Sequence, residues 1–318
     1  LNKKLEVTID VYKKETTDMI LPSSLPVYTG IGTEYNDIKA PIVNAGKMTN
    51  QGIDIGVTSY NVTTKDFDWK TNVVFSKYKN TLNYLNNETA AISEFLEYGN
   101  AVLVSRSMRG RAVGGFYGFV SDGLFRSEAE LNSAADQGIG ISPKGTWLGD
   151  VRYKDLNGDG KIDDGDMTYI GDPNPDFTFG FTNTFRYKNL DLSVFLQGTY
   201  GNDILNYTKR TTEQLSNVYA NQLNTVQDRY TTTNTNGNVP RYNQWHNNNF
   251  RVSDRFVEDG SYLRIQNVTL GYNLPQKWIS KAKIAKARLF STGQNLYTFT
   301  NYTGFDPELG AFNNSATF

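Results

Sequence analysis

Cysteine is absent from the 318-residue chain, and histidine occurs only once, as His246. The absence of cysteine excludes disulfides and thiolate metal sites. A single histidine excludes a histidine-cluster metal site and leaves a serine-type nucleophile only one histidine as base. Because His246 stands among Asn, Gln and Trp in the polar segment 243–249, we expect a solvated loop histidine without a catalytic role.

Long hydrophobic runs are also lacking, since no stretch approaches the roughly 18 apolar residues of a membrane-spanning helix. The sequence therefore excludes a helical membrane protein. The formal net charge is -1 and no stripe of Lys and Arg runs along the chain, so no nucleic-acid partner is expected. A transmembrane β-barrel is compatible with this composition, because barrel strands alternate lipid-facing and lumen-facing residues.

The sequence does contain a two-residue alternation of apolar and polar side chains, which predicts antiparallel β-strands with one face of each kind. The clearest case is 177–187, where Phe177, Phe179 and Phe181 alternate with Thr and Gly. The pattern also predicts strands at 1–12, 53–58, 67–75, 190–200, 262–274 and 286–300. Short turns at 63–65 and 188–189 join two pairs of these strands into hairpins.

Two details of the strands carry further predictions. In the segment 262–274 the apolar set slips by one residue near Gln266 or Asn267, which predicts a β-bulge. In a barrel the polar residues of the strands would line a wet lumen, while the apolar residues would contact outer-membrane lipid. The residues expected in the lumen include Asp54, Asp68, Lys70, Arg186 and Gln197.

The connections between the predicted strands alternate in length. Those at 63–65, 188–189 and 275–285 are short, whereas those at 13–49, 80–174 and 201–260 are long. Outer-membrane barrels have short periplasmic turns and long extracellular loops, so this rhythm gives each strand a direction. We expect a signal peptide upstream of Leu1 and one further inward strand after Phe318. The alternative, a soluble β-sandwich or jelly roll, would have connections of more uniform length.

An acidic loop lies within the long 80–174 connection. Its oxygen-bearing side chains have the spacing of a calcium loop, with Gly160 at the sharp turn and Ile162 as an apolar anchor. Calcium would stiffen an extracellular loop that we expect to lack a core of its own. The alternative is an Asp/Asn/Gly turn without an ion. The expected calcium ligands are Asp155, Asn157, Asp159, Asp163, Asp166 and the carbonyl of Lys161.

Several motifs recur together in a fixed order along the chain. They are NQGID at 50–54, GGFYGF at 114–119, DGLF at 122–125, GDVRYK at 149–154, DPNPDF at 172–177, YLRIQNVTLGY at 262–272, GQNL at 293–296 and GFDPE at 304–308. In combination they resemble the SusC/RagA group of TonB-dependent transporters from Bacteroidetes.

This resemblance implies an outer-membrane barrel of about 22 strands closed by an N-terminal plug. Residues 1–318 would be the C-terminal portion of the barrel, with the plug, the N-terminal strands and the last strand outside this chain. The resemblance also implies a SusD-like surface lipoprotein as a lid, and import of glycans or peptides powered through TonB.

Aromatic and amide side chains in a polar segment of the 201–260 connection suggest a substrate-binding surface. The candidates are Tyr242, Gln244 and Trp245, together with 247–249, which could stack on and hydrogen-bond a sugar or peptide. The alternative for each residue is ordinary loop composition, since loops are polar in general. Two other function classes are open: a secreted calcium-stabilised carbohydrate-binding module, and a surface glycosidase with paired carboxylates. Because the chain has 33 Asp and Glu residues, some pair of carboxylates is available in any fold, and such a pair is therefore no evidence for a glycosidase. We expect no enzyme.

Overall fold

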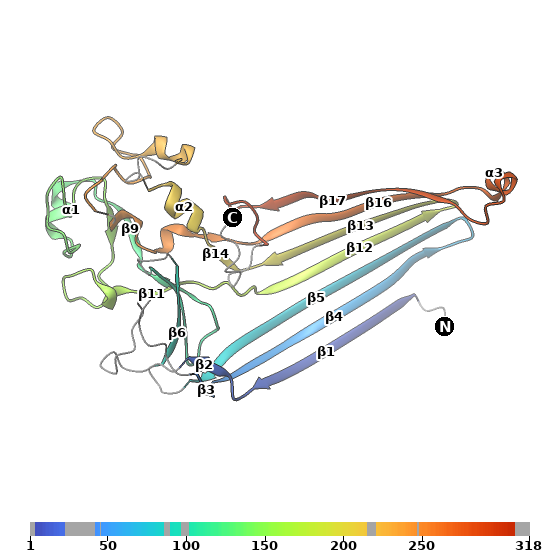
Figure 1. Ribbon diagram of the computed structural model, residues 1–318, viewed down its shortest axis with the longest axis horizontal. Coiled ribbons are helices and arrows are strands. Elements are labelled where there is room, and N and C mark those ends of the chain that lie inside the picture. The colour runs from blue at the N-terminus through green and yellow to red at the C-terminus, as the bar shows by residue number, and fades with distance from the viewer. Residues whose placement is uncertain are drawn as a thin grey trace.

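The computed structural model describes residues 4–22, 42–44, 46–85, 90–96, 102–214, 221–246 and 248–308. Seven long strands form one antiparallel sheet, in which each strand pairs with the next long strand along the chain (Figure 1). The all-β antiparallel prediction is thus confirmed. The strands are β1 (Leu5–Thr16), β4 (Lys47–Thr63), β5 (Phe67–Tyr84), β12 (Phe177–Tyr187), β13 (Leu190–Tyr200), β16 (Tyr262–Asn273) and β17 (Arg288–Thr300).

All seven predicted strands are present, but several boundaries differ. β4 spans Lys47–Thr63, where the alternation predicted only 53–58, and β17 begins at Arg288 rather than at residue 286. β1 continues to Thr16, beyond the predicted end, because its pairing with β4 extends to Met48. β5 continues to Tyr84, so the prediction that the long connection starts at Asn80 is wrong. Leu82, which is fully buried, anchors this extension against the long loops. Strands β1 and β5 are therefore longer at the long-loop end than the alternation predicted.

The connections separate to opposite ends of the sheet. The turns 64–66, 188–189 and 274–287 lie together at one end, the short-turn end, on the right of Figure 1. The long connections gather at the other, the long-loop end, on the left. The predicted alternation of short and long connections is confirmed, and with it the alternating direction of the strands.

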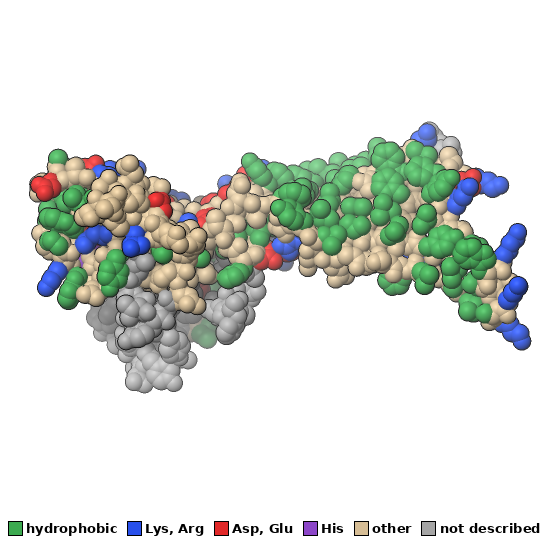
Figure 2. Space-filling model, turned by 90° about the horizontal axis from the view of Figure 1, so that it is seen from above, with side chains coloured by type: hydrophobic (Ala, Val, Ile, Leu, Met, Phe, Trp, Pro, Cys, Tyr) green, Lys and Arg blue, Asp and Glu red, His purple; other side chains and the backbone are tan. Residues whose placement is uncertain are grey.

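The sheet has one apolar and one polar face. Ile55, Phe75 and Phe179 are paired across neighbouring strands and therefore lie on the same face. Figure 2 shows hydrophobic side chains spread over the strand half of the molecule. The opposite face holds all the residues predicted for the lumen, namely Asp54, Asp68, Lys70, Arg186 and Gln197.

The predicted β-bulge is present in β16. Phe195 of β13 pairs with Asn267 and Leu196 pairs with Ile265, so Gln266 is the extra residue. On the other side of β16 the register with β17 also shifts between Ile265 and Asn267. The extra residue explains the slip in the sequence, because it lets the alternation resume with Val268 on the apolar face.

Charged side chains cross the polar face near the short-turn end. Arg186 of β12 forms an ion pair with Asp68 of β5, and Arg288 of β17 forms one with Asp191 of β13. Arg288 reaches Asp191 across the intervening strand β16, where the residue is Gly271. A Cβ atom at Gly271 would lie 2.6 Å from Oδ2 of Asp191, so only glycine leaves this crossing open.

The long connections fold into a cap at the long-loop end, made of the described residues within 90–175 and 201–261. The short helices α1 (Glu128–Ser133) and α2 (Tyr207–Thr212) lie in the cap, whereas α3 (Gln276–Ile279) lies at the short-turn end. No helix in the described part of the chain has both the length and the apolar character needed to cross a membrane. The short strands are β2 (Ile20–Pro22), β3 (Ile42–Asn44), β6 (Ala91–Leu96), β7 (Val102–Met108), β8 (Phe116–Gly118), β9 (Ser121–Leu124), β10 (Val151–Tyr153), β11 (Thr168–Gly171), β14 (Asp203–Leu205) and β15 (Val257–Asp259).

The cap has a hydrophobic core, so the prediction of a long loop without a core is wrong. Phe119, Leu124, Val151, Tyr153 and Ile162 are all buried and pack together. Short two-stranded pairings, such as that between β9 and β10, bring these residues together from separate parts of the loop. The acidic loop is therefore attached to a packed structure through Ile162.

Candidate functional site

The acidic loop at 155–166 turns sharply through two glycines. Gly158 and Gly160 have φ values of +75° and +83°, which glycine adopts at little cost. The Asp155 carboxylate accepts hydrogen bonds from both of their backbone N–H groups, at 2.6 and 2.8 Å. Asp159 likewise accepts from the N–H of Lys161 at 2.9 Å. The first half of the loop is thus held by its own side chains; Asp155 is half-buried and Asp159 is exposed.

Asp166 differs from the other predicted ligands because it is fully buried. One carboxylate oxygen accepts from the N–H of Leu156 at 2.8 Å, and the other accepts from the N–H of Asp163 at 3.0 Å. Burial opposes ionisation, but the backbone hydrogen bonds outweigh it and hold the pKa of Asp166 below its usual value. Asp166 therefore closes the loop by binding its backbone.

The predicted calcium ligands Asp155, Asp159 and Asp166 make hydrogen bonds within the loop. Among the described residues, no group of three or more His, Cys, Asp or Glu side chains could hold a metal ion. Asp166 accepts hydrogen bonds from the backbone N–H groups of Leu156 and Asp163, and a hydrogen bond with the Asp155 side chain helps to lower its pKa. Calcium binding at this loop remains a prediction, and the loop has internal contacts that hold it without an ion.

Arg251 joins the acidic loop to the cap core, a role that the sequence reasoning missed. Its guanidinium carbon lies 4.9 Å from the ring centroid of Phe119. It donates hydrogen bonds to the backbone carbonyls of Ile162 at 3.3 Å and Gln137 at 3.2 Å. Burial lowers the pKa of Arg251, and the nearby carboxylate of Asp164 opposes that shift. No local pattern marks this residue, because its partners lie about 90 to 110 positions away in the chain.

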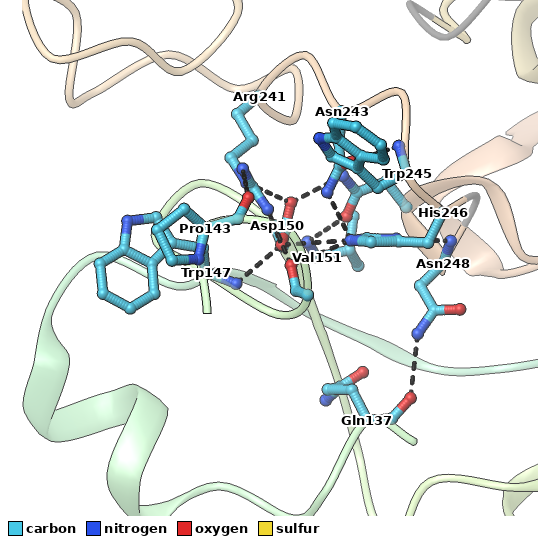
Figure 3. A network of polar contacts seen from close by, with 12 residues as sticks. Gln137, Pro143, Trp147, Asp150, Val151, Arg241, Asn243, Trp245, His246 and Asn248 are labelled. Carbon is cyan, nitrogen blue, oxygen red and sulfur yellow. Dashed lines mark hydrogen bonds and ion pairs between the residues drawn. The ribbon is translucent and has the colours of Figure 1, made fainter. Parts of the chain in front are cut away.

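Asp150 connects two long loops of the cap, as Figure 3 shows. Its carboxylate accepts from the Arg241 guanidinium at 2.8 and 2.9 Å, from the Trp147 N–H at 2.8 Å, and from the Asn249 side chain at 2.9 Å. Asn249 in turn accepts from the N–H of Val151. Asp150 and Asn249 are almost completely buried. The network fixes the segment 241–249 to the segment 147–151.

The three predicted substrate-binding residues lie on the outside of this network. Trp245 is 59% exposed and Tyr242 is 43% exposed. The Tyr242 hydroxyl donates to the side chain of Gln244 at 3.2 Å, which places these two residues together. Lys144, from the other loop, has its ammonium 4.7 Å from the Trp245 ring centroid. The arrangement presents an aromatic and amide surface to solvent on a fixed backbone. Of the segment 247–249, residue 247 lies outside the described residues, and Asn249 is buried in the Asp150 network.

His246 is not the solvated loop residue that its polar neighbours predicted. Its side chain is only 9% exposed. Nδ1 accepts from the N–H of Asn248 at 3.2 Å, and Nε2 lies 3.0 Å from the carbonyl oxygen of Gly145 and 2.5 Å from the Asn243 side-chain amide. This histidine helps to hold the two loops of the Asp150 network together. The prediction was wrong because a polar segment can be buried when its side chains bind another loop.

A segment after β17 folds back onto the polar face of the sheet. Arg264 of β16 is buried and forms ion pairs with Asp306 at 2.5 Å and with Glu308. Gln197 of β13 donates to Glu308 at 2.9 Å. The GFDPE motif at 304–308 belongs to the resemblance, but its contact with Arg264 could not be read from the sequence. The segment lies next to the polar face that the prediction assigned to a lumen.

The polar face also has an open hollow of about 560 Å³ between strands β1 and β16. Small residues deepen it: a Cβ atom at Gly180 would lie 2.8 Å from the Val74 side chain. Asp54, Thr178 and Phe195 are among the side chains that line it. The hollow combines polar groups with the aromatic residues Phe195 and Tyr262 on the face opposite the apolar side chains.

Known proteins with similar sequences match nearly all of this chain. TonB-dependent receptor P3 of Formosa agariphila is 36% identical over 96% of the chain, which corresponds to 29% of that receptor. Receptor P26 of the same species is 30% identical over 96% of the chain and 30% of its own length. The chain belongs to the TonB-dependent receptor family. TonB-dependent receptor SusC of Bacteroides thetaiotaomicron is 24% identical over 97% of the chain and 28% of its own length, which agrees with the SusC/RagA resemblance. No family model matches.

Solved structures agree with the TonB-dependent receptor fold. The RagAB peptide transporter aligns with a TM-score of 0.74 and 22% identity, covering 98% of this chain and 32% of that chain. The RagAB peptide importer in its open-open state gives a TM-score of 0.72 and 21% identity, covering 97% and 31%. These proteins are receptors and transporters, which agrees with the expectation that the chain is not an enzyme. The chain spans about a third of the length of the relatives that it matches.

Proposed function

We propose that this TonB-dependent receptor segment forms the C-terminal portion of an outer-membrane barrel that imports glycans or peptides. The observation that carries the proposal is the amphipathic sheet. Its apolar face exposes large side chains over several strands, among them Val11 at 78%, Leu289 at 64% and Phe299 at 53%. A surface of this kind is stable in lipid when the backbone between the strands is fully paired.

The sheet requires further strands in order to function in a bilayer. β1 and β17 are its two edges, and neither has a second partner strand among the described residues. Unpaired backbone N–H and C=O groups are costly in hydrocarbon, so other parts of the receptor would pair with these edges. A plug would close the barrel and contact TonB, and the cap would face the cell exterior. A SusD-like lipoprotein would cover the cap as a lid.

The exposed surface formed by Tyr242, Gln244 and Trp245 is our candidate for first contact with cargo. Aromatic rings bind the flat faces of sugars and the side chains of peptides, and the amide of Gln244 supplies hydrogen bonds to either. The peptide specificity of RagAB supports a peptide cargo, since the two folds correspond over nearly the whole chain. The Asp150 network would keep this surface rigid, which limits the entropy lost on binding.

Uptake by cells tests the proposal. A strain that lacks this receptor should take up labelled oligosaccharides or peptides more slowly than the parent, and deletion of TonB should give the same defect. Trp245→Ala in the intact receptor should reduce uptake several-fold, whereas Ile141→Ala, which removes another exposed apolar side chain of the cap, should not. Unchanged uptake in the receptor deletion strain, or a receptor found in the soluble cell fraction, would contradict the proposal.

A further inference from the structure

Lysines are concentrated at the short-turn end of the sheet. The three turns there contain six of them, and all six are exposed. The only acidic residue in these turns is Asp66. Figure 2 shows Lys and Arg side chains clustered at the outer end of the strand half of the molecule. The six residues, which form the lysine rim, are Lys65, Lys188, Lys277, Lys281, Lys283 and Lys286.

The charges of the lysine rim are not neutralised within the part of the chain that the structure describes. None of its lysines takes part in an ion pair there, although Arg288 and Asp191 are paired nearby on the polar face. Lys188 has an aromatic neighbour instead, with its ammonium 5.4 Å from the ring centroid of Tyr187. The rim therefore offers free positive charge to a partner.

Apolar and aromatic side chains lie directly beside the rim. Trp278 and Ile284, in the turn between β16 and β17, are 65% and 45% exposed. The row of the apolar face closest to the turns includes Tyr187, Leu190 and Leu289, all of them exposed. Trp and Tyr are enriched where hydrocarbon meets headgroups, and lysine can extend from there into the polar layer. Along the strand direction, the exposed side chains change from apolar to aromatic and then to the lysines of the rim.

We propose that the lysine rim binds the anionic headgroups of phospholipids at the membrane surface next to the short-turn end. The inference rests on the proposed function, because a barrel in a bilayer places these turns at headgroup depth. The lysines come from three separate turns along the width of the sheet, joining β4 to β5, β12 to β13 and β16 to β17. A row of charges spread over that width matches an extended anionic surface better than a compact acidic site.

Lipid binding by the intact receptor tests the inference. The receptor is reconstituted into nanodiscs of phosphatidylcholine with a minority of phosphatidylglycerol, and the lipid that copurifies is counted by native mass spectrometry. The variant K277Q/K281Q/K283Q/K286Q should reduce phosphatidylglycerol enrichment about tenfold. Arginine at the same four positions should preserve it. A matched variant at the long-loop end, K14Q/K144Q/K154Q/K161Q, removes the same charge from exposed positions of the polar face and the cap and should leave the enrichment unchanged.

The outcomes separate this inference from the proposed function. A receptor that enters bilayers but shows no preference for phosphatidylglycerol overturns only the inference. A receptor that does not enter bilayers at all overturns the proposed function as well. Equal loss of enrichment in the rim variant and in the matched variant would also overturn the inference, because the effect would then follow net charge rather than position.

Discussion

The two ends of the sheet use charged side chains in opposite ways. At the long-loop end, buried pairs such as Asp150 with Arg241 connect segments that lie 91 residues apart in the chain. At the short-turn end, the lysine rim is exposed, and none of its lysines has an ion-pair partner in the described residues. Removing one member of a buried pair leaves an uncompensated charge, whereas removing an exposed lysine costs little. Charge therefore holds the cap together at one end and is available for binding at the other.

The largest effect is expected from breaking the Asp150 network. Asp150→Ala would leave the Arg241 guanidinium and the Asn249 amide without their buried partner, and should lower the local unfolding free energy of the cap by about 3–5 kcal/mol. Hydrogen exchange of the segments 143–151 and 241–249 in the intact receptor would measure this. Exchange in the strands β12 and β13 should not change.

Asp122 is a control for Asp150, because it is also a carboxylate paired with an arginine but is not buried. Asp122 pairs with Arg152 at 2.9 Å, but its side chain is 51% exposed. Asp122→Ala should cost less than about 1 kcal/mol by the same measurement. If Asp122→Ala and Asp150→Ala destabilised the cap equally, the comparison between buried and exposed charge would be wrong.

The second-largest effect is expected from removing the buried side chain that anchors the acidic loop to the cap core. Ile162→Ala removes a buried side chain from the cap core and should destabilise the cap by about 3 kcal/mol. Leu156→Ala, in the same loop, changes a side chain that is 48% exposed and should alter stability by less than about 0.5 kcal/mol. Thermal unfolding followed by near-ultraviolet circular dichroism would compare them. Equal melting temperatures for the two variants would show that the core does not anchor the loop.

Calcium should have a smaller effect, because the loop already satisfies much of its own backbone. If the ion binds, a calcium concentration ten times Kd would add about 1.4 kcal/mol of stability to the loop. Amide exchange across 155–166, measured with calcium and after EGTA, would detect that change, while exchange in the short turns should stay the same. An unchanged exchange rate would leave the loop as an Asp/Asn/Gly turn without an ion.

The smallest effect is expected at the lysine rim. The variant K277Q/K281Q/K283Q/K286Q should change the unfolding free energy of the receptor by less than about 0.5 kcal/mol, since these side chains are exposed and form no ion pair among the described residues. Urea unfolding in detergent would test this. A clear loss of stability would mean that the rim lysines stabilise the fold itself.

The features that sequence predicted correctly depend on neighbouring residues. Alternation with a period of two marked all seven strands, and the Lys188 turn and the Gln266 bulge followed from local irregularities in that pattern. Pairing in order along the chain then placed the predicted lumen residues on one face. Each step required only residues that are close together in sequence or that pair in consecutive strands.

The features that sequence missed depend on contacts between distant loops. His246 and Asp150 belong to one network, but they lie in separate connections, and nothing in either segment indicates the other. The buried Arg264 pairs with Asp306 only because the chain folds back after β17. The candidates Tyr242 and Trp245 are exposed, and their role in substrate binding stays a prediction. Composition predicts that a loop is polar but does not determine which polar groups become buried.

Gly271 makes the ion pair between Arg288 and Asp191 possible. Its missing side chain lets the Arg288 guanidinium cross β16 to reach Asp191, so the three positions form one unit spread over three strands. A larger residue at position 271 would block this crossing and leave Arg288 and Asp191 without their ion-pair partners. If both charged residues were lost, position 271 would no longer require glycine. In an alignment of relatives these three positions should therefore co-vary, with glycine at 271 wherever the charged pair occurs.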